Sequence, residues 1–140
     1  MNKISVFTDG GSRGNPGPAA IGVVVKAETG KILATISRKI GEATNNVAEY
    51  RAVLSALTWI KENKTIVLQQ NVSRIQFFLD STLVANQLNG IFKVKDGRLR
   101  EFLLTARILE SEIGLDIHYQ YVPREKNFEA DFLVNQAFDN

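Results

Sequence analysis

Hydrophobic and polar positions alternate along the first part of the chain. Residues 3–8 alternate and lead into a dense cluster of turn-forming residues at 9–18. Two further apolar segments follow at 20–26 and 32–40, with a short turn at 28–31 between them. Alternation with a period of two and short connections predicts three strands in an antiparallel meander.

From residue 45 the apolar positions recur at helical spacing, which predicts a long helix with candidate cap residues at its start. The rest of the chain is interpreted as a polar connection at 63–73, a strand at 74–79, helices at 81–88 and 99–113, a strand at 115–121 and a terminal helix at 129–138. A helix between two strands implies parallel pairing. We therefore expect an α/β fold with a mixed sheet and a single domain over residues 1–140.

The composition narrows the chemistry of any site. The chain has no cysteine and one histidine among its 140 residues, which excludes disulfides, thiolate nucleophiles and zinc sites built from cysteine or clustered histidine. A bound metal would therefore have oxygen ligands, which favours Mg²⁺, Mn²⁺ or Ca²⁺. A hydrophobic content of 44% is enough for a core without covalent or metal cross-links.

The charge is nearly balanced, with 17 basic against 15 acidic side chains, so only its distribution bears on partners. The first residues lack the apolar core and cleavage site of a signal peptide. No apolar stretch approaches the roughly 18 residues of a membrane span. We expect a soluble, cytoplasmic monomer.

Two aspartates, Asp9 and Asp80, each follow an apolar strand directly before a polar turn. Ligands of open α/β sheets collect at the carboxyl ends of strands. If the first and fourth strands are parallel neighbours, the two carboxylates lie side by side. They would then raise each other's pKa unless a cation lies between them, which predicts a divalent metal site.

Two further acids, Glu49 and Asp131, lie near the starts of predicted helices. On pattern alone, the helix macrodipole explains a carboxylate there better than a site does. The glycine-rich segment at 9–18 lacks the spacing of dinucleotide-binding and P-loop motifs. It is also about twice as long as a usual hairpin connection of about two to five residues, and this excess favours a functional role.

Four motifs occur in order along nearly the whole chain. They are FTDGGSRGNPG at 7–17 with AIG at 20–22, TNNVAEY at 44–50, DSTLV at 80–84, and VPREKN at 122–127 with AD at 130–131. Together they closely resemble type 1 ribonuclease H, in a compact subgroup that lacks the family's basic protrusion.

The resemblance implies a five-stranded mixed sheet, three strands antiparallel and two parallel, flanked by helices. It also implies endonucleolytic hydrolysis of the RNA strand of RNA–DNA hybrids, leaving 5′-phosphate and 3′-hydroxyl ends. By motif position, Asp9, Glu49, Asp80 and Asp131 would be the catalytic and metal-binding acids, holding two Mg²⁺ ions or Mn²⁺ as a substitute. The alternative is a noncatalytic module of the same fold that binds hybrid or double-stranded RNA.

Substrate recognition needs further residues, because metal ions do not distinguish RNA from DNA whereas contacts to the 2′-hydroxyl do. The candidates are Gly10, Gly11 and Ser12 through backbone amides, Asn15, Asn45 and Asn46 through side-chain amides, and Thr44 for a phosphate of the DNA strand. In the alternative interpretation the first asparagine is a turn residue and the other two are helix caps. Double-stranded RNA remains a possible second substrate.

Two departures from the family pattern concern the basic protrusion and a histidine. The segment at 90–100 is short, but its basic residues, with Phe92 among them, are candidates to track phosphates: Lys93, Lys95, Arg98 and Arg100. The alternative is a solvated loop and helix start. No histidine lies shortly before Asp131, where many relatives have one. Arg124, Glu125 and Lys126 are the candidates to assist leaving-group or product release instead.

Overall fold

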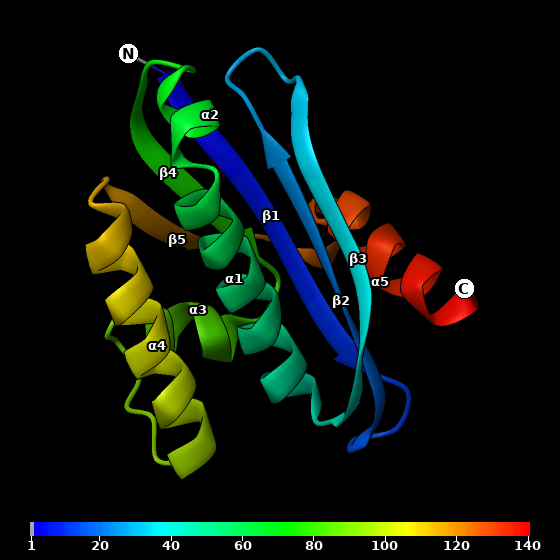
Figure 1. The fold of residues 1–140 in the computed structure, drawn as a ribbon. Helices are drawn as coiled ribbons and strands as arrows, with labels where there is room; N and C mark the ends of the chain where they lie inside the picture. Colours follow the sequence, from blue (N-terminus) through cyan, green and yellow to red (C-terminus); the bar gives the residue numbers. More distant parts are fainter. Residues whose placement is uncertain (1) are drawn as a thin grey trace.

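The computed structural model describes residues 2–140, which form a five-stranded sheet in the order β3-β2-β1-β4-β5 (Figure 1). The strands are β1 (Asn2–Ser12), β2 (Gly17–Lys26), β3 (Ile32–Ala43), β4 (Val72–Leu79) and β5 (Ile117–Tyr121). The pairs β1–β2 and β2–β3 are antiparallel, and β1–β4 and β4–β5 are parallel. The expected mixed sheet with an antiparallel meander is confirmed, and β1 and β4 meet the condition under which Asp9 and Asp80 would be neighbours.

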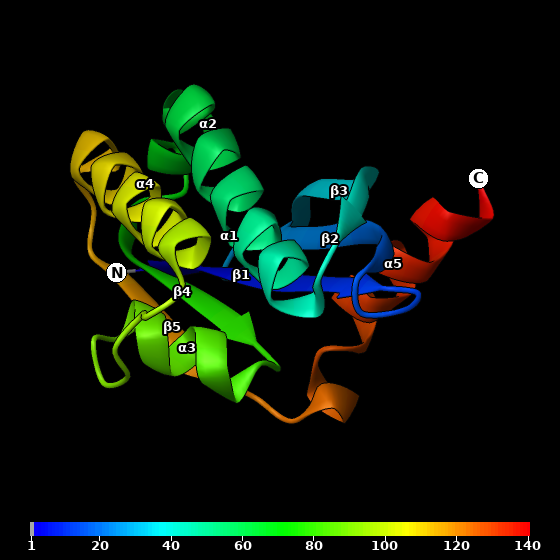
Figure 2. The same ribbon diagram turned by 90° about the horizontal axis from the view of Figure 1, so that it is seen from below.

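Helices cover both faces of this sheet. They are α1 (Asn45–Glu62), α2 (Lys64–Leu68), α3 (Thr82–Leu88), α4 (Gly97–Ile113) and α5 (Phe128–Asp139). In Figure 1, α1 crosses in front of the sheet with α4 beside it, and α5 runs behind β2 and β3. Figure 2 shows the end of the molecule where β1 finishes and α1 begins.

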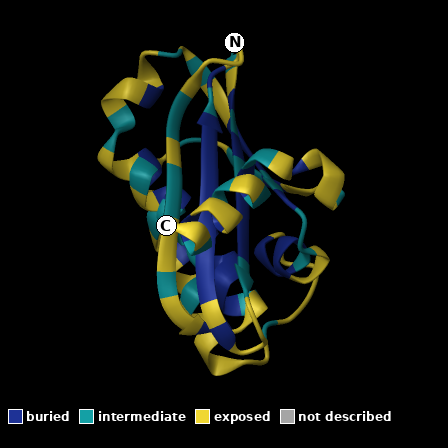
Figure 3. Cartoon of the chain, turned by 90° about the vertical axis from the view of Figure 1, so that its right-hand side faces the viewer, coloured by how far each residue is buried: buried dark blue, intermediate teal, exposed yellow. Residues whose placement is uncertain are grey.

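The main core lies between the sheet and the α1 side, and it includes the fully buried Tyr50, Leu57 and Phe77. A second, small cluster around Val134 joins α5 to the opposite face. Figure 3 shows the central strands almost entirely buried, whereas the outward faces of the helices are exposed. The sheet is therefore a buried platform whose two faces are covered by different helices.

Two glycines allow the helices to approach the sheet closely. A Cβ atom on Gly10 would lie 2.2 Å from the Ala48 carbonyl oxygen of α1, and one on Gly22 would lie 2.2 Å from the Ala130 carbonyl oxygen of α5. Successive residues of a strand point to opposite faces. Gly10 thus faces α1, and Asp9, which is paired with Gly22, faces α5.

The helix ends follow local capping chemistry. The Thr44 hydroxyl accepts a hydrogen bond from the Val47 amide at the start of α1, and Asp96 caps α4 in the same way. Gly114 ends α4 in the left-handed conformation, with φ of 71°. The predicted start of α1 and the predicted end of α4 are both confirmed.

The glycine-rich segment was interpreted wrongly as a long loop that begins at Asp9. Strand β1 continues to Ser12, because Gly10, Gly11 and Ser12 pair with residues 19–21 of β2. The connection consists only of residues 13–16, which is an ordinary length for a hairpin. Its length therefore does not indicate a functional role. Asp9 accordingly lies inside a strand rather than at its end.

Smaller differences concern the connections. The polar connection predicted at 63–73 contains α2, which the fully buried Val67 anchors, and the first residues of β4. A 3-10 turn at Arg124–Lys126 precedes α5 and had not been predicted. Within residues 2–140, no helix is both long enough and apolar enough to cross a membrane.

Candidate active site

Three carboxylates converge where β1, β4 and α1 meet. Asp9 comes from the middle of β1, Glu49 from the second turn of α1, and Asp80 from the residue after β4. One carboxylate oxygen from each lies within 4.8 Å of the other two. They line a cavity of about 500 Å³ at this end of the sheet.

Glu49 is held by the backbone of β1. Its Oε1 accepts a hydrogen bond of 3.2 Å from the Gly10 amide, which also bonds Asp9 Oδ1 at 3.0 Å. The Glu49 Oε2 atom is buried and has no hydrogen-bond partner within residues 2–140. A buried carboxylate oxygen without a hydrogen-bond partner is costly, so this atom is suited to coordinate a cation.

The electrostatics of the cluster also favour a cation. Burial, with repulsion from Asp80 and Asp131, raises the pKa of Asp9 to about 7 against the hydrogen bond to Glu49. Burial and the charge of Asp9 raise the pKa of Glu49 well above its ordinary value. Burial raises the pKa of Asp80 too. Negative charge is disfavoured at all three positions until a cation compensates it.

The fourth predicted acid, Asp131, lies in the first turn of α5 and lines the same cavity. It is outside the three-acid cluster, and its side chain is half-buried. Arg124 Nη2 lies 3.3 Å from Asp131 Oδ1, and this contact raises the pKa of Arg124. The structure thus brings all four predicted acids to one cavity. Three of them have carboxylate oxygens within 4.8 Å of one another, and Asp131 is paired with Arg124.

Asn127 is a residue of this site for which the sequence suggested no role. It is only 1% exposed, and its Nδ2 donates to the Thr8 carbonyl at 2.8 Å and to Asp80 Oδ2 at 3.3 Å. The hydrogen bond to Asp80 lowers the pKa of that carboxyl, opposing burial. A buried amide just before α5 therefore connects Asp80 to β1, and its place inside the VPREKN motif was the available signal.

The predicted substrate-binding residues around α1 contact one another. Asn45 Oδ1 accepts from the Ser12 amide at 2.9 Å and from its hydroxyl at 3.1 Å. Asn15 Oδ1 accepts from the Asn45 amide at 3.0 Å. The cavity lining includes Gly10, Gly11, Ser12, Asn45 and Asn46 but neither Asn15 nor Thr44. The asparagine oxygens thus fasten the β1–β2 turn to the start of α1.

Comparison with known proteins agrees with this geometry. A family model described as reverse transcriptase-like matches residues 7–137. Ribonuclease HI of Halobacterium salinarum is 38% identical over 138 residues, which cover 99% of this chain and 65% of that protein. The chain belongs to the type 1 ribonuclease H family.

Solved structures of ribonuclease H proteins share the fold. RNase H1 from Halobacterium salinarum matches with a TM-score of 0.85 at 39% identity, covering 98% of each chain. LC11-RNase H1, solved in complex with an RNA/DNA hybrid, matches with a TM-score of 0.87 at 40% identity, covering 97% of this chain and 96% of that one.

Some relatives are longer. The bifunctional protein Rv2228c of Mycobacterium tuberculosis is 40% identical over 138 residues, which cover 98% of this chain but 36% of that protein. This ribonuclease H chain therefore spans about a third of the length of that curated relative.

The remaining predicted substrate residues of this chain lie outside the acidic cluster. Lys93 and Lys95 are exposed in the connection between α3 and α4, and neither forms an ion pair with the residues described. Arg124 lines the cavity, whereas Lys126 is exposed in the same 3-10 turn outside it. His118 lies in β5 and bonds Asp116 at 2.8 Å, outside the cavity lining.

Proposed function

We propose that residues 1–140 form a single ribonuclease H domain that hydrolyses the RNA strand of RNA–DNA hybrids. The observation that carries this proposal is the convergence of Asp9, Glu49 and Asp80, with the buried Glu49 Oε2 left unpartnered. The relatives named Ribonuclease HI and the hybrid complex of LC11-RNase H1 support the same activity.

The donor set fits a hard divalent cation. Every candidate ligand is a carboxylate oxygen, the type that Mg²⁺ and Mn²⁺ prefer. Asp9, Glu49 and Asp80 would hold the metal, with Asp131 as a fourth ligand from the rim. Two such ions would activate the attacking water and stabilise the leaving 3′-oxygen, and the products would then carry 5′-phosphate and 3′-hydroxyl ends.

The chain's own residues hold the acids in place before substrate arrives. The Gly10 amide fixes Glu49 and Asp9 together, and Asn127 fixes Asp80 against β1. Arg124 holds Asp131 at the rim. Such preorganisation lowers the reorganisation needed when charge develops on the scissile phosphate.

We expect polar groups in the cavity and at its edge, beside the acids, to select the RNA strand. The Asn15 and Asn45 oxygens are used within the protein, so their Nδ2 groups are the donors left for a minor groove carrying 2′-hydroxyls. Asn46 and the Gly11 backbone complete this surface, whereas the Gly10 and Ser12 amides are bonded within the protein. Thr44, at the start of α1, would contact a phosphate of the DNA strand.

The short connection between α3 and α4 extends the electrostatic footprint. Lys93, Lys95 and Lys126 are exposed and would contact phosphates outside the cavity. A footprint with few cations predicts hybrid binding that is weaker than in relatives with the full protrusion. Arg124 and Lys126 are also the candidates to assist product release.

The test compares the chain with its Asp9→Asn variant on an end-labelled RNA–DNA hybrid in Mg²⁺ or Mn²⁺. We expect internal cuts in the RNA strand by the chain, loss of at least about 10³-fold in rate in the variant, and retained hybrid binding by the variant in EDTA. A parallel reaction on double-stranded RNA measures breadth of specificity.

Undiminished cleavage by Asp9→Asn would overturn the assignment. Binding of the hybrid by the unmodified chain without any cleavage, in either metal, would favour the noncatalytic module instead. Asp116→Asn serves as the matched control, because that exposed aspartate pairs with Arg74 and His118 outside the cavity.

A further inference from the structure

A second like-charged cluster lies on the β3 side of α1. Arg38 of β3 donates from Nη2 to the Ser55 hydroxyl of α1 at 3.1 Å, and Arg51 of α1 donates from Nη1 back to the Ile40 carbonyl of β3 at 3.3 Å. Residues 51 and 55 are neighbours on one helix face, and 38 and 40 point to the same side of one strand. The two guanidinium groups therefore bridge β3 and α1 side by side.

Neither guanidinium has an acidic partner among the residues described. Arg38 and Arg51 are bonded to a hydroxyl and a carbonyl, and neither takes part in an ion pair. Arg51 is only partly exposed, so its charge is partly removed from water. Adjacent guanidinium forks that keep N–H groups unused match the oxygens of a phosphate.

The two arginines open onto a groove of about 500 Å³ between β3, α1 and α4. Trp59 and Phe102 lie in its walls, together with Ile36 and Leu54. Both aromatic side chains are partly exposed, so ring surface is accessible from the groove. A groove with cations at one end and aromatic walls suits a phosphate joined to a base, because bases stack on aromatic rings.

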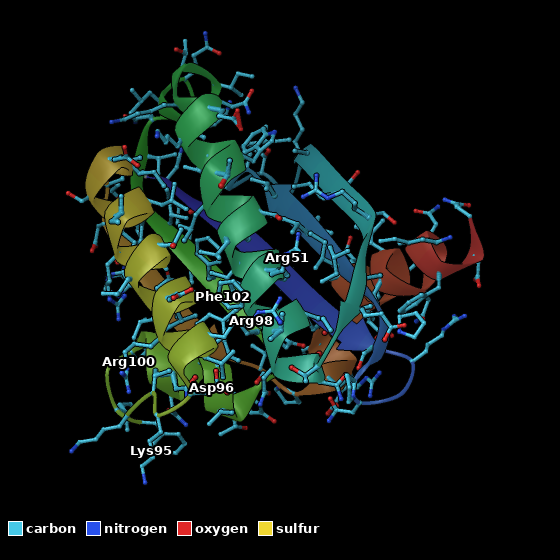
Figure 4. The ribbon with its side chains drawn as sticks, turned by 60° about the horizontal axis from the view of Figure 1, so that its bottom comes forward. Arg51, Lys95, Asp96, Arg98, Arg100 and Phe102 are labelled. Atoms are coloured by element: carbon cyan, nitrogen blue, oxygen red, sulfur yellow. The ribbon has the colours of Figure 1, made fainter. Side chains whose placement is uncertain are left out.

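A third arginine lies near the groove, outside its lining residues. Arg98 of α4 lies over the Phe102 ring at 5.8 Å and forms no ion pair within the described chain. In Figure 4, Arg98 and Phe102 lie on the side of α4 that faces α1, whereas Arg100 and Lys95 lie toward the outer side and the loop. Arg100 is bonded to the carbonyls of Val94 and Lys95 and so fixes that loop.

The groove has a direction because its single acid is far from the arginines. Glu62 is eleven residues after Arg51 on α1, which corresponds to about 16 Å along the helix. A phosphate would be repelled at the Glu62 end and attracted at the Arg51 end. The Arg51 end lies half a turn beyond Glu49, so it is the end nearer the acidic cluster.

We propose that this groove is a second nucleic-acid subsite, which takes a phosphate and a base of a single strand. The phosphate binds Arg38 and Arg51, and the base lies against Trp59 and Phe102. A single-stranded DNA extension that leaves the hybrid past the start of α1 is its occupant during catalysis. That last role rests on the proposed function, whereas binding of a single strand does not.

The chain carries its own reporter for this subsite, because Trp59 is its only tryptophan. Titration of the full chain in EDTA with a single-stranded oligothymidylate of eight nucleotides should quench Trp59 fluorescence in a saturable way. Arg38→Gln combined with Arg51→Gln should weaken this binding by at least about tenfold. Inorganic phosphate alone should bind far more weakly and leave the fluorescence nearly unchanged.

Lys3→Gln is the matched control, since it removes one exposed charge from the opposite face of the sheet and should change affinity by less than about twofold. Arg38→Gln alone guards against misfolding, because that side chain is exposed and loses only its bond to Ser55. Circular dichroism checks that each variant is folded. Absence of quenching, or equal affinity of a folded Arg38→Gln variant and the chain, would overturn the subsite.

Cleavage separates this inference from the proposed function. In Mg²⁺, a hybrid with a single-stranded DNA extension on the appropriate end should be cut with a lower KM than the blunt hybrid, and Arg38→Gln should remove that difference without changing kcat on the blunt hybrid. If no hybrid is cut, the proposed function fails while the fluorescence result still decides the subsite. Equal KM for blunt and extended hybrids at both ends would refute the role in catalysis.

Discussion

Helix α1 separates two clusters of like charge that differ in how the protein holds them. The acids Asp9, Glu49 and Asp80 are buried or half-buried, and the Gly10 amide and the Asn127 side chain fix them. The arginines Arg38 and Arg51 are more exposed, and neutral oxygens hold them.

Because the two clusters differ in burial, they suit different ligands. Burial raises the pKa of the three acids, so a small ion of high charge density gains most by entering. The guanidinium groups keep their charge and present forks to solvent, which suits a large, flexible polyanion. A buried site for a small cation and a more exposed site for a polyanion thus lie on two sides of α1.

The largest effect is expected where α1 meets β1. Gly10→Ala places a Cβ atom 2.2 Å from the Ala48 carbonyl oxygen and 2.7 Å from the Glu49 amide nitrogen, and only movement of the helix relieves this contact. We expect a loss of about 3 kcal/mol in the free energy of unfolding, with cleavage abolished. Urea denaturation measures the first and the hybrid assay the second.

Gly97→Ala is the control for this change, because no atom lies within 4 Å of the added Cβ at the start of α4. Its stability should equal or slightly exceed that of the chain. Equal stability of Gly10→Ala and Gly97→Ala would show that the close approach of α1 to β1 is wrong.

Asn127→Ala should loosen one acid and leave the arginines untouched. It removes the donor to the Thr8 carbonyl and to Asp80, leaving a buried acceptor unsatisfied, at a cost of about 2 kcal/mol. Thermal denaturation should show the loss of stability, and kcat should fall while binding of the oligothymidylate does not. A variant with full activity would mean that Asp80 needs no such positioning.

The pH dependence of stability should distinguish the acids from the arginines. In EDTA, Asp9 with a folded pKa of about 7 binds more protons than in the unfolded chain, whose aspartates have a pKa of 3.8. Stability must then fall as pH rises from about 4 to about 7, by about 3 kcal/mol for Asp9 alone. Denaturation across that range, repeated with Asp9→Asn, should show a smaller slope in the variant.

Mg²⁺ should reverse this loss at pH 8, since it binds the deprotonated acids of the folded state. An unfolding free energy that rises between pH 4 and pH 7 in EDTA would contradict the raised pKa of these groups.

The smallest effect is expected from the basic cluster. Arg38→Gln should leave stability within about 0.5 kcal/mol, because the side chain is exposed. Its effect should appear in the salt dependence of single-strand binding, where the slope of log K against log salt falls by about one. An unchanged slope would mean that no phosphate contacts Arg38.

Much of the fold could be predicted because local patterns decide it. Alternation gave the strands their faces, and Thr44 and Gly114 ended helices by capping chemistry that needs no distant partner. The neighbouring positions of Asp9 and Asp80 followed only on the condition that β1 and β4 are parallel neighbours, which the structure meets.

Long-range contacts could not be read in the same way. Glycines usually mark turns, so the strand character of Gly10 and Gly11 was missed; it depends on pairing with β2 and on α1 passing close above. Periodicity alone explained Glu49 as a first-turn acid, because nothing local reveals that its helix crosses β1 at Gly10. The hydrogen bonds by which Arg38 and Arg51 each link β3 to α1 likewise depend on how these two elements pack.

The most direct test of the acidic cluster is a calorimetric titration of the chain with Mn²⁺ at pH 7, beside Asp80→Asn. Mn²⁺ should bind the chain saturably. Its affinity for the variant should be at least about tenfold lower, because one of three converging carboxylates is lost. Equal affinity of the two proteins for Mn²⁺, or no binding to either at millimolar concentrations, would contradict the assignment of Asp9, Glu49 and Asp80 as the metal site.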